Sequence, residues 1–309
     1  MQDKRVLVTG GAGFIGSNLA NHLAADNDVV VVDDCSIGTA DNLDDDVEFH
    51  ERSVLDDDLP TDVDVLFHLA AISTLTLHEE DTAARRRGAR VNVEGFVNAV
   101  DQARLDGCDT VVYATTSSIY GDRTEPSPET MPVEANTGYE ASKLGRERYA
   151  EYFHNYHDMT LAGMRFFSVY QGYEGAEAHK GDFANIVAQF ADDVASGESP
   201  VVYGDGTHTR DLTHVSDVVR GCELAADHEL DGIYNLGTGE QHSANEIVET
   251  LTEILGSDVE PEHVENPIDE DVFVHDTMAD YSKMHEATGW EPTVGFEEGL
   301  RMVCAPYLD

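Results

Sequence analysis

The sequence is poor in positive charge. Only 18 of its 309 residues are lysine or arginine, against 62 aspartates and glutamates, and the formal net charge is −44. Such a surface repels phosphate backbones and anionic lipid headgroups, so the composition argues against binding to nucleic acid or to a membrane surface. Abundant carboxylates with only four lysines are typical of proteins from salt-rich cytoplasms, where counter-ions screen the self-repulsion of the surface.

Long apolar runs and clustered cysteines are also missing. No apolar stretch reaches roughly 18 residues, and the N-terminal residues lead directly into a strand pattern, so neither a membrane span nor a signal peptide is expected. The cysteines stand far apart, without the spacing of a metal site, at positions 35, 108, 222 and 304. This distribution argues against zinc and structural disulfides. We therefore expect a cytoplasmic protein without a metal site.

The first half of the chain alternates short β-branched runs with helical patterns. Apolar residues make up 41% of the chain, which is enough for a substantial core. Strands are expected at residues 5–8, 29–32, 63–69, 110–114 and 161–166, and helices at 13–25, 91–105 and 139–154. The alternation predicts an α/β fold, a Rossmann doubly wound parallel sheet.

After about residue 167 the pattern becomes irregular. Glycine-rich turns interrupt it, one clear helix is expected at 183–196, and α/β elements return at 215–226 and 233–236. We expect a sheet domain in residues 1–167, with returning segments near 212–237. A smaller, irregular C-terminal region in 168–309 would mainly bind substrate.

A glycine-rich turn joins the first expected strand to the first expected helix. Residues 9–17 read Thr-Gly-Gly-Ala-Gly-Phe-Ile-Gly-Ser. Glycines allow a tight turn, and they let backbone amides approach a pyrophosphate at the positive end of the helix. About twenty residues on, the second strand ends at Asp33, whose carboxylate can accept both hydroxyls of an adenine ribose. Because this charge, doubled by Asp34, repels a 2′-phosphate, the pattern predicts NAD rather than NADP.

A tyrosine and a lysine four residues apart form the predicted catalytic pair. Tyr139 and Lys143 lie on one face of an expected helix. A phenol has an ordinary pKa of about 10, and a neighbouring ammonium favours the phenolate. The pair also follows a strand that ends in four hydroxyl residues, 115–118. Together these features favour a functional pair over a chance Tyr–Lys spacing on an amphipathic helix.

These motifs, in their order along the chain, resemble those of the extended short-chain dehydrogenase/reductase family, specifically its nucleotide-sugar epimerases and dehydratases. Further matching segments lie at residues 68–71, 92–95, 116–121, 165–170, 203–211, 234–239, 290–292 and 298–300. The resemblance covers nearly the whole chain, and the pattern is most similar to that of UDP-glucose 4-epimerases. It implies a homodimer formed through the helices at 91–105 and 139–154.

The resemblance implies a role for each matching residue. Tyr139 would take the proton of a sugar hydroxyl, Lys143 would hold the nicotinamide ribose, and Thr116 would bind the reacting oxygen. The implied cofactor-binding residues are Gly10, Gly13, Phe14, Ile15, Gly16, Asp33, Asp34, Gly38, Ser53, Val54, Leu69, Ala70, Ala71, Asn92, Tyr139, Lys143 and Phe166. The implied substrate-binding residues are Thr116, Ser117, Ser168, Lys180, Tyr203 and Arg210.

Some positions depart from the family pattern. Ser53 replaces an Asp near the adenine, Ser168 replaces an Asn beside the substrate diphosphate, and Ile268 occupies the approximate place of a phosphate-binding Arg. Lys180 follows His179 in a segment similar to one in heptose-nucleotide and deoxy-sugar epimerases, where a lysine lies at the substrate. A surface lysine or a simple phosphate contact is the alternative interpretation.

The residues after Thr116 distinguish between the reactions of the family. Sugar dehydratases and decarboxylases place carboxylates there, whereas this chain has Ser117 and Ser118, which cannot act as acid and base at neutral pH. An NAD-dependent epimerase is therefore predicted, with UDP-glucose and UDP-galactose or the matching uronic acids as default substrates. The alternatives are another epimerase, a decarboxylase or dehydratase, or a dehydrogenase that releases NADH. A non-enzymatic dinucleotide sensor would typically lack the Tyr–Lys pair.

Overall fold

A seven-stranded parallel sheet forms the centre of the protein, in a computed structural model that describes residues 1–73, 81–267 and 273–308. The strand order is β11-β6-β5-β4-β1-β2-β3. The strands are β1 (Arg5–Thr9), β2 (Asp28–Asp33), β3 (Glu48–Glu51), β4 (Val65–His68), β5 (Thr110–Ala114), β6 (Thr160–Phe166) and β11 (Gly232–Leu236). The predicted doubly wound α/β fold is confirmed.

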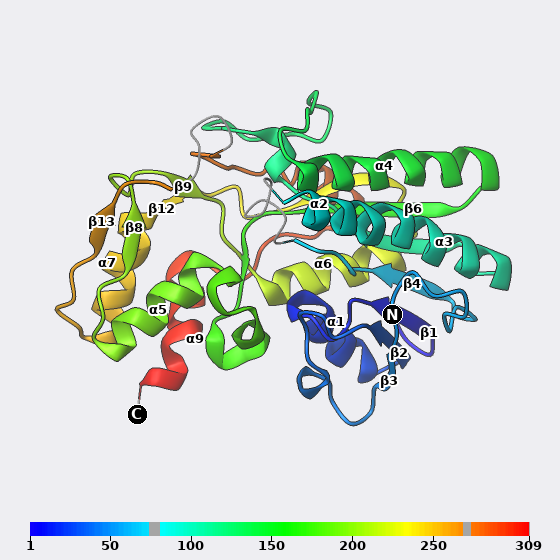
Figure 1. Ribbon diagram of the computed structural model, residues 1–309, viewed down its shortest axis with the longest axis horizontal. Coiled ribbons are helices and arrows are strands. Elements are labelled where there is room, and N and C mark those ends of the chain that lie inside the picture. The colour runs from blue at the N-terminus through cyan, green and yellow to red at the C-terminus, as the bar shows by residue number, and fades with distance from the viewer. Residues whose placement is uncertain (74–80, 268–272, 309) are drawn as a thin grey trace.

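Helices cover both faces of this sheet. The covering helices are α1 (Phe14–Ala24), α2 (Thr82–Ala89), α3 (Gly95–Asp106), α4 (Gly138–His157) and α6 (Val215–Asp227). Because side chains alternate along a strand, Val6 and Val8 pack in one core with α1 and α6, while Leu7 packs in another with α3 and α4. Figure 1 shows α3 and α4 side by side on the opposite side of the strands from α1.

The strand order reverses next to β1. From β1 the chain runs outward through β2 and β3, and then returns to place β4 on the other side of β1. In parallel sheets of this kind, ligands bind in the crevice at the carboxyl ends of the strands that flank such a reversal. The fold therefore predicts a ligand site at the carboxyl ends of β1, β2 and β4.

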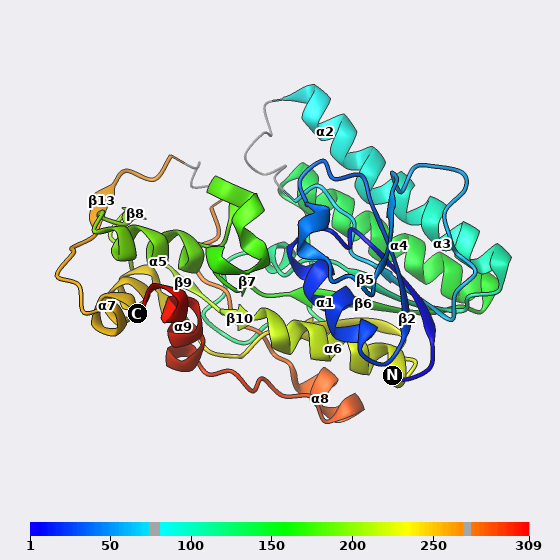
Figure 2. The ribbon, with the colours of Figure 1, turned by 90° about the horizontal axis from the view of Figure 1, so that it is seen from below.

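A third apolar core lies away from the sheet. It is built by α5 (Ile186–Ser196), α7 (Ala244–Leu255) and α9 (Phe296–Cys304). Short strands accompany these helices in pairs: β7 (Val169–Tyr170) with β10 (Thr213–His214), β8 (Val201–Tyr203) with β13 (Glu262–Val264), and β9 (Thr209–Arg210) with β12 (His242–Ser243). Helix α8 (Ser282–Thr288) packs instead beside the sheet through Met284. Figure 2 shows α5, α7 and α9 gathered at one end of the molecule.

Several predicted boundaries were wrong. The helix expected at 183–196 begins at Ile186, because the Asn185 side chain caps it and Gly181 at φ 50° breaks the preceding turn. The helix expected at 91–105 is split into a π-helical turn, Arg90–Glu94, and α3. Strand β3 was missed because its sequence, Glu-Phe-His-Glu, is that of a polar edge strand. None of the helices in the described ranges combines the length and hydrophobicity that a membrane crossing requires.

Candidate active site

A pocket opens at the carboxyl edge of the sheet, where β1, β2, β4, β5 and β6 end. It brings together residues from distant parts of the chain. The predicted cofactor-binding residues that line it are Gly10, Gly13, Phe14, Ile15, Gly16, Asp33, Asp34, Gly38, Val54, Leu69, Ala70, Ala71, Tyr139, Lys143 and Phe166. Lys180, expected at the substrate, also lines this pocket.

The glycine-rich turn lies against the rest of the pocket without room for side chains. Gly10 has a φ of 71°, and a Cβ atom there would stand 2.5 Å from the backbone nitrogen of Ala70. A Cβ at Gly16 would stand 2.1 Å from the carbonyl oxygen of Gly10. Both glycines are therefore required by close backbone approach, and the turn leaves α1 to begin at Phe14 with its N-terminus at the pocket.

Asp33 closes the far end of the pocket at the tip of β2. Its carboxylate accepts hydrogen bonds from the backbone amides of Ala12, at 3.1 Å, and Cys35, at 2.8 Å. Burial raises the pKa of Asp33, and these two hydrogen bonds oppose the rise because they stabilise the charged form. Asp33 thus ties the end of β2 to the glycine-rich turn.

Tyr139 and Lys143 lie together near the start of α4. A capping box formed by Thr137 and Glu140 fixes this helix end. The Lys143 ammonium lies 5.6 Å from the centre of the Tyr139 ring and donates a hydrogen bond to the Ala114 carbonyl, at 3.2 Å. The predicted juxtaposition of tyrosine and lysine is present in the structure.

Burial shifts both pKa values towards the neutral forms. Desolvation raises the pKa of the Tyr139 phenol, while a hydrogen bond with the Thr116 hydroxyl and the positive charge of Arg146 oppose this rise. Desolvation lowers the pKa of Lys143 well below its usual value, and the nearby Arg146 adds to the effect. The Arg146 charge and the Thr116 hydrogen bond favour the deprotonated phenol, which suits a group that takes up and returns a proton.

Arg146 holds the pocket walls together from inside the molecule. The side chain is fully buried, and its guanidinium donates to the carbonyl oxygens of Ala70, Asn92 and Ala114. These carbonyls come from three separate segments that border the pocket. Sequence reasoning missed this residue, although it stands three residues after Lys143 on the same helix.

Two predicted cofactor-binding residues do not line the pocket. The Asn92 side chain is buried, accepts from the Ile72 amide, and donates to the Ile72 carbonyl and the Ser142 hydroxyl. The Ser53 hydroxyl accepts a hydrogen bond from the Leu55 amide within a turn. The Asn92 side chain is thus engaged by Ile72 and Ser142, and the Ser53 hydroxyl by its own turn, and neither is among the residues that line the pocket.

Sequence reasoning also missed part of the lining. The missed residues include Ser36, Ile37, Arg52, Ile72, Ser73, Val91, Thr115 and His179. Arg52, Val91, Thr115 and His179 are immediate neighbours of predicted residues. The motif positions could have located these segments. They could not have shown which of two adjacent side chains lines the pocket.

The other predicted substrate-binding residues lie outside this pocket. Thr116 makes a hydrogen bond with the Ser118 hydroxyl, at 3.0 Å, and Ser117 is buried beside it. Ser168 has a φ of 23° after β6. Arg210 donates to the carbonyl oxygens of Thr209 and His275, and burial lowers its pKa. Tyr203 lies on β8 and is 38% exposed, whereas Ile268 lies outside the described residues.

Comparison with known proteins agrees with the fold. The sequence pattern of the NAD dependent epimerase/dehydratase family matches residues 6–237. The UDP-glucose 4-epimerase of Mycolicibacterium smegmatis is 33% identical over 310 residues, with 96% of each chain covered. UDP-glucuronic acid decarboxylase 6 of Arabidopsis thaliana is 30% identical over 311 residues, covering 97% of this chain and 87% of the relative.

A solved structure extends the similarity to three dimensions. The crystal structure of a UDP-glucose 4-epimerase from Thermotoga maritima with UDP-glucose superimposes with a TM-score of 0.88 at 31% identity, and 97% of each chain is covered. The family pattern spans the glycine-rich turn, the Tyr–Lys pair and the last strand of the sheet. The chain therefore belongs to the NAD dependent epimerase/dehydratase family.

Proposed function

We propose that this protein is an NAD-dependent nucleotide-sugar epimerase that interconverts UDP-glucose and UDP-galactose, or a matching pair of UDP-sugars. The observation that carries the proposal is the placement of Tyr139 and Lys143 in the pocket that the glycine-rich turn borders, with the Thr116 hydroxyl hydrogen-bonded to Tyr139. Proton transfer and cofactor binding would then occur side by side.

The residues of the pocket fit a dinucleotide. Gly10 and Gly16 pack so closely against neighbouring backbone that no side chain fits there, as a turn that binds a pyrophosphate requires. The carboxylate of Asp33 borders the same pocket at the end of β2. When bound, NAD supplies a reversible acceptor of hydride from a sugar carbon. Tyr139 takes the proton of the hydroxyl on that carbon and later returns it, while Thr116 holds the same oxygen. Epimerisation would require the sugar to present its other face before hydride returns to the carbon and the proton to the oxygen.

The hydroxyls after Thr116 favour epimerisation over elimination or decarboxylation. Ser118 donates to or accepts from Thr116, and neither Ser117 nor Ser118 offers a carboxylate for removing water or assisting loss of a carboxyl group. Similarity to plant decarboxylases therefore supports the shared oxidation step, and the serines support the epimerase outcome. A dehydrogenase would differ by releasing reduced cofactor in each turnover.

The direct test uses no added cofactor. Purified protein in multimolar KCl is incubated with UDP-glucose or with UDP-galactose, and the sugar anomeric signals are followed by NMR. We expect each substrate to yield a mixture of both sugars. If NAD is bound but neither sugar changes, the substrate is a different nucleotide sugar. If turnover depends on added NAD and releases NADH, the dehydrogenase alternative replaces this proposal.

The composition extends the proposal to the conditions of function. We place the enzyme in a salt-rich cytoplasm, because counter-ions are needed to screen a net charge of −44. The expected result is a free energy of unfolding that rises as KCl increases to multimolar concentration. Urea unfolding at a series of KCl concentrations measures it, and stability that stays flat or falls would contradict the assignment.

We also propose a homodimer through the outer faces of α3 and α4. These adjacent helices carry exposed apolar side chains, at Leu105, Tyr149, Tyr152 and Tyr156. A second copy would cover them in a four-helix arrangement. Light scattering after gel filtration should give a dimer mass that falls to the monomer mass in Tyr152→Glu. A monomeric wild-type protein would contradict this proposal.

A further inference from the structure

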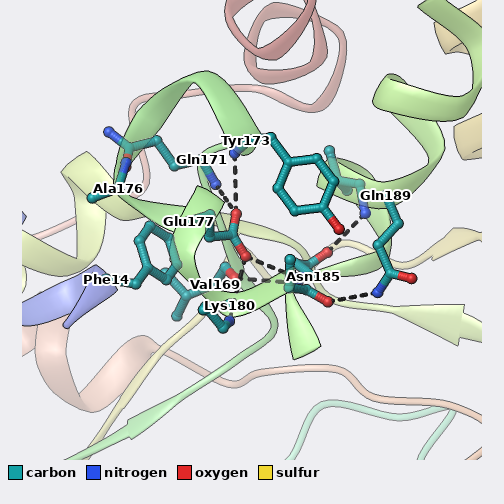
Figure 3. A network of polar contacts seen from close by, with 12 residues as sticks. Phe14, Val169, Gln171, Tyr173, Ala176, Glu177, Lys180, Asn185 and Gln189 are labelled. Carbon is teal, nitrogen blue, oxygen red and sulfur yellow. Dashed lines mark hydrogen bonds and ion pairs between the residues drawn. The ribbon is translucent and has the colours of Figure 1, made fainter. Parts of the chain in front are cut away.

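A segment from outside the sheet borders the candidate cofactor pocket. Residues 171–185, here called the strap, follow β7 and lead into α5. Two residues of the strap, His179 and Lys180, line the pocket together with the glycine-rich turn. Figure 3 shows the strap from close by, with Lys180 beside Phe14. The pocket is therefore closed on one side by chain that lies more than a hundred residues after the glycine-rich turn.

The strap is fastened to α1 and to the loop after β2. The amides of Gln171 and Asn18 exchange two hydrogen bonds, at 3.0 and 2.9 Å. The His179 ring nitrogen Nδ1 lies 3.2 Å from the side-chain amide nitrogen Nδ2 of Asn42. Lys180 adds a third contact, with its ammonium 5.2 Å from the centre of the Phe14 ring. These contacts hold the strap against the N-terminal half of α1 and against the loop after β2, beside the pocket.

Glu177 organises the strap from within. Its side chain is fully buried, and its carboxylate accepts from the backbone amides of Gln171, at 2.8 Å, and Gly172, at 3.0 Å. The other carboxylate oxygen accepts from the Asn185 amide, at 2.8 Å, and from the Lys180 ammonium, at 3.4 Å. A buried carboxylate is tolerated only when it is fully paired, so this one joins the beginning and end of the strap to Lys180.

The position of Lys180 indicates its ligand. The ammonium is held between the Glu177 carboxylate and the face of Phe14, the first residue of α1. The N-terminus of α1 carries partial positive charge and free backbone amides. A fixed cation and a helix N-terminus therefore meet beside glycines that leave no room for side chains, which is a suitable environment for a diphosphate.

We propose that Lys180 binds the pyrophosphate of the bound dinucleotide, that Glu177 positions it, and that the strap slows cofactor release. This inference rests on the proposed function and assigns Lys180 to the cofactor rather than to the sugar. It also gives the strap a purpose in the reaction. An enzyme that uses the same NAD in each cycle gains from a slow release rate, and the strap must detach from α1 before the cofactor leaves.

The test measures the release of NAD directly. Wild type, Lys180→Gln, Lys180→Arg and the exposed control Lys4→Gln are loaded with labelled NAD in multimolar KCl and chased with unlabelled NAD. Loss of a charge-assisted hydrogen bond should speed release by roughly tenfold to a hundredfold in Lys180→Gln. Lys180→Arg should lie between that variant and wild type, and Lys4→Gln should match wild type. At saturating NAD, the KM for the UDP-sugar should stay unchanged in every variant.

The role of Glu177 is tested by a double-variant cycle. Glu177→Gln, checked for folding by circular dichroism, should also speed NAD release. If Glu177 acts through Lys180, the double variant should release NAD no faster than Lys180→Gln alone. Additive effects would show that Glu177 does not act through Lys180 and would overturn the positioning role. If Glu177→Gln does not fold, the release rate of Lys180→Gln decides the proposal.

The outcomes separate this inference from the proposed function. Lys180→Gln that releases NAD at the wild-type rate would overturn the inference, and a raised KM for the UDP-sugar in that variant would move Lys180 to the substrate. Such results would leave the epimerase proposal standing. A wild-type protein that binds no NAD would overturn both.

Discussion

Glu147 and Arg165 form a two-point ion pair between α4 and β6. The Arg165 guanidinium donates to Glu147 at 3.1 and 2.7 Å, and the two side chains are 4% and 7% exposed. Thr115, from the pocket wall, donates to the same carboxylate at 2.7 Å. The pair thus connects the helix that carries Tyr139 to the strand that ends at Phe166.

Removing one partner of this pair should destabilise the fold strongly. Arg165→Met leaves a buried carboxylate without its cation, so the free energy of unfolding should fall by about 3–5 kcal/mol. Arg148 pairs with Glu151 at the surface of the same helix, and Arg148→Met should change stability by less than about 1 kcal/mol. Urea unfolding at one fixed KCl concentration compares the two. Equal losses would mean that burial of the pair has no special effect.

Tyr139→Phe should abolish turnover and keep NAD bound. The substitution removes only the hydroxyl that hydrogen-bonds with Thr116 and that we propose to transfer the proton. General acid–base groups typically contribute about a hundredfold to ten-thousandfold, so kcat should fall at least by that factor. Conversion of UDP-sugar by NMR and the NAD content after acid release are measured on the same sample. Retained turnover would contradict the mechanism.

Gly16→Ala should disturb the pocket, whereas Gly295→Ala should not. A Cβ at Gly16 would stand 2.1 Å from the Gly10 carbonyl oxygen, while a Cβ at Gly295 meets nothing within 4 Å. Because the nearest atoms at Gly16 are backbone atoms of Gly10 and Gly11, the glycine-rich turn must shift, at a cost of roughly 1–3 kcal/mol. We expect Gly16→Ala to lose most of its bound NAD. Equal NAD content in the two purified variants would show that the turn accommodates the methyl group.

His68 should make stability depend on pH below its ordinary pKa. The ring is fully buried, and desolvation together with the charges of Arg146 and Lys143 lowers its pKa well below the usual 6.5. In the unfolded chain, His68 binds a proton near pH 6.5, whereas the folded protein does not, so stability is complete above this pH and falls as the pH decreases. This group contributes at most about 1.4 kcal/mol per pH unit.

The comparison with His68→Asn isolates this contribution. An asparagine retains a polar group near Thr9, whose hydroxyl lies 3.0 Å from His68 Nδ1, but it does not titrate. Urea unfolding between pH 7.5 and about pH 5 should therefore give a shallower loss of stability in the variant than in wild type. Parallel pH profiles would show that His68 does not contribute.

Local geometry explains what could be predicted from the sequence. The glycine-rich turn depends on a few neighbouring residues, and the Tyr139–Lys143 pair on the helical repeat, so both could be recognised before the fold was known. The β-branched runs likewise predicted buried parallel strands. Prediction failed where local and distant effects compete: the polar sequence of β3 hid an edge strand, and Asn185 capped a helix that hydropathy had started three residues earlier.

The sequence by itself therefore determined the α/β fold, the glycine-rich turn and the juxtaposition of Tyr139 and Lys143, because chain connectivity and short-range periodicity encode them. Only the tertiary structure decided which of two adjacent side chains faces the pocket, as for Val91 beside Asn92. It alone also placed Lys180 against Phe14 and joined it to Glu177. These contacts depend on how helices and loops pack on the sheet, and packing brings together residues whose separation along the chain carries no record of their distance in space.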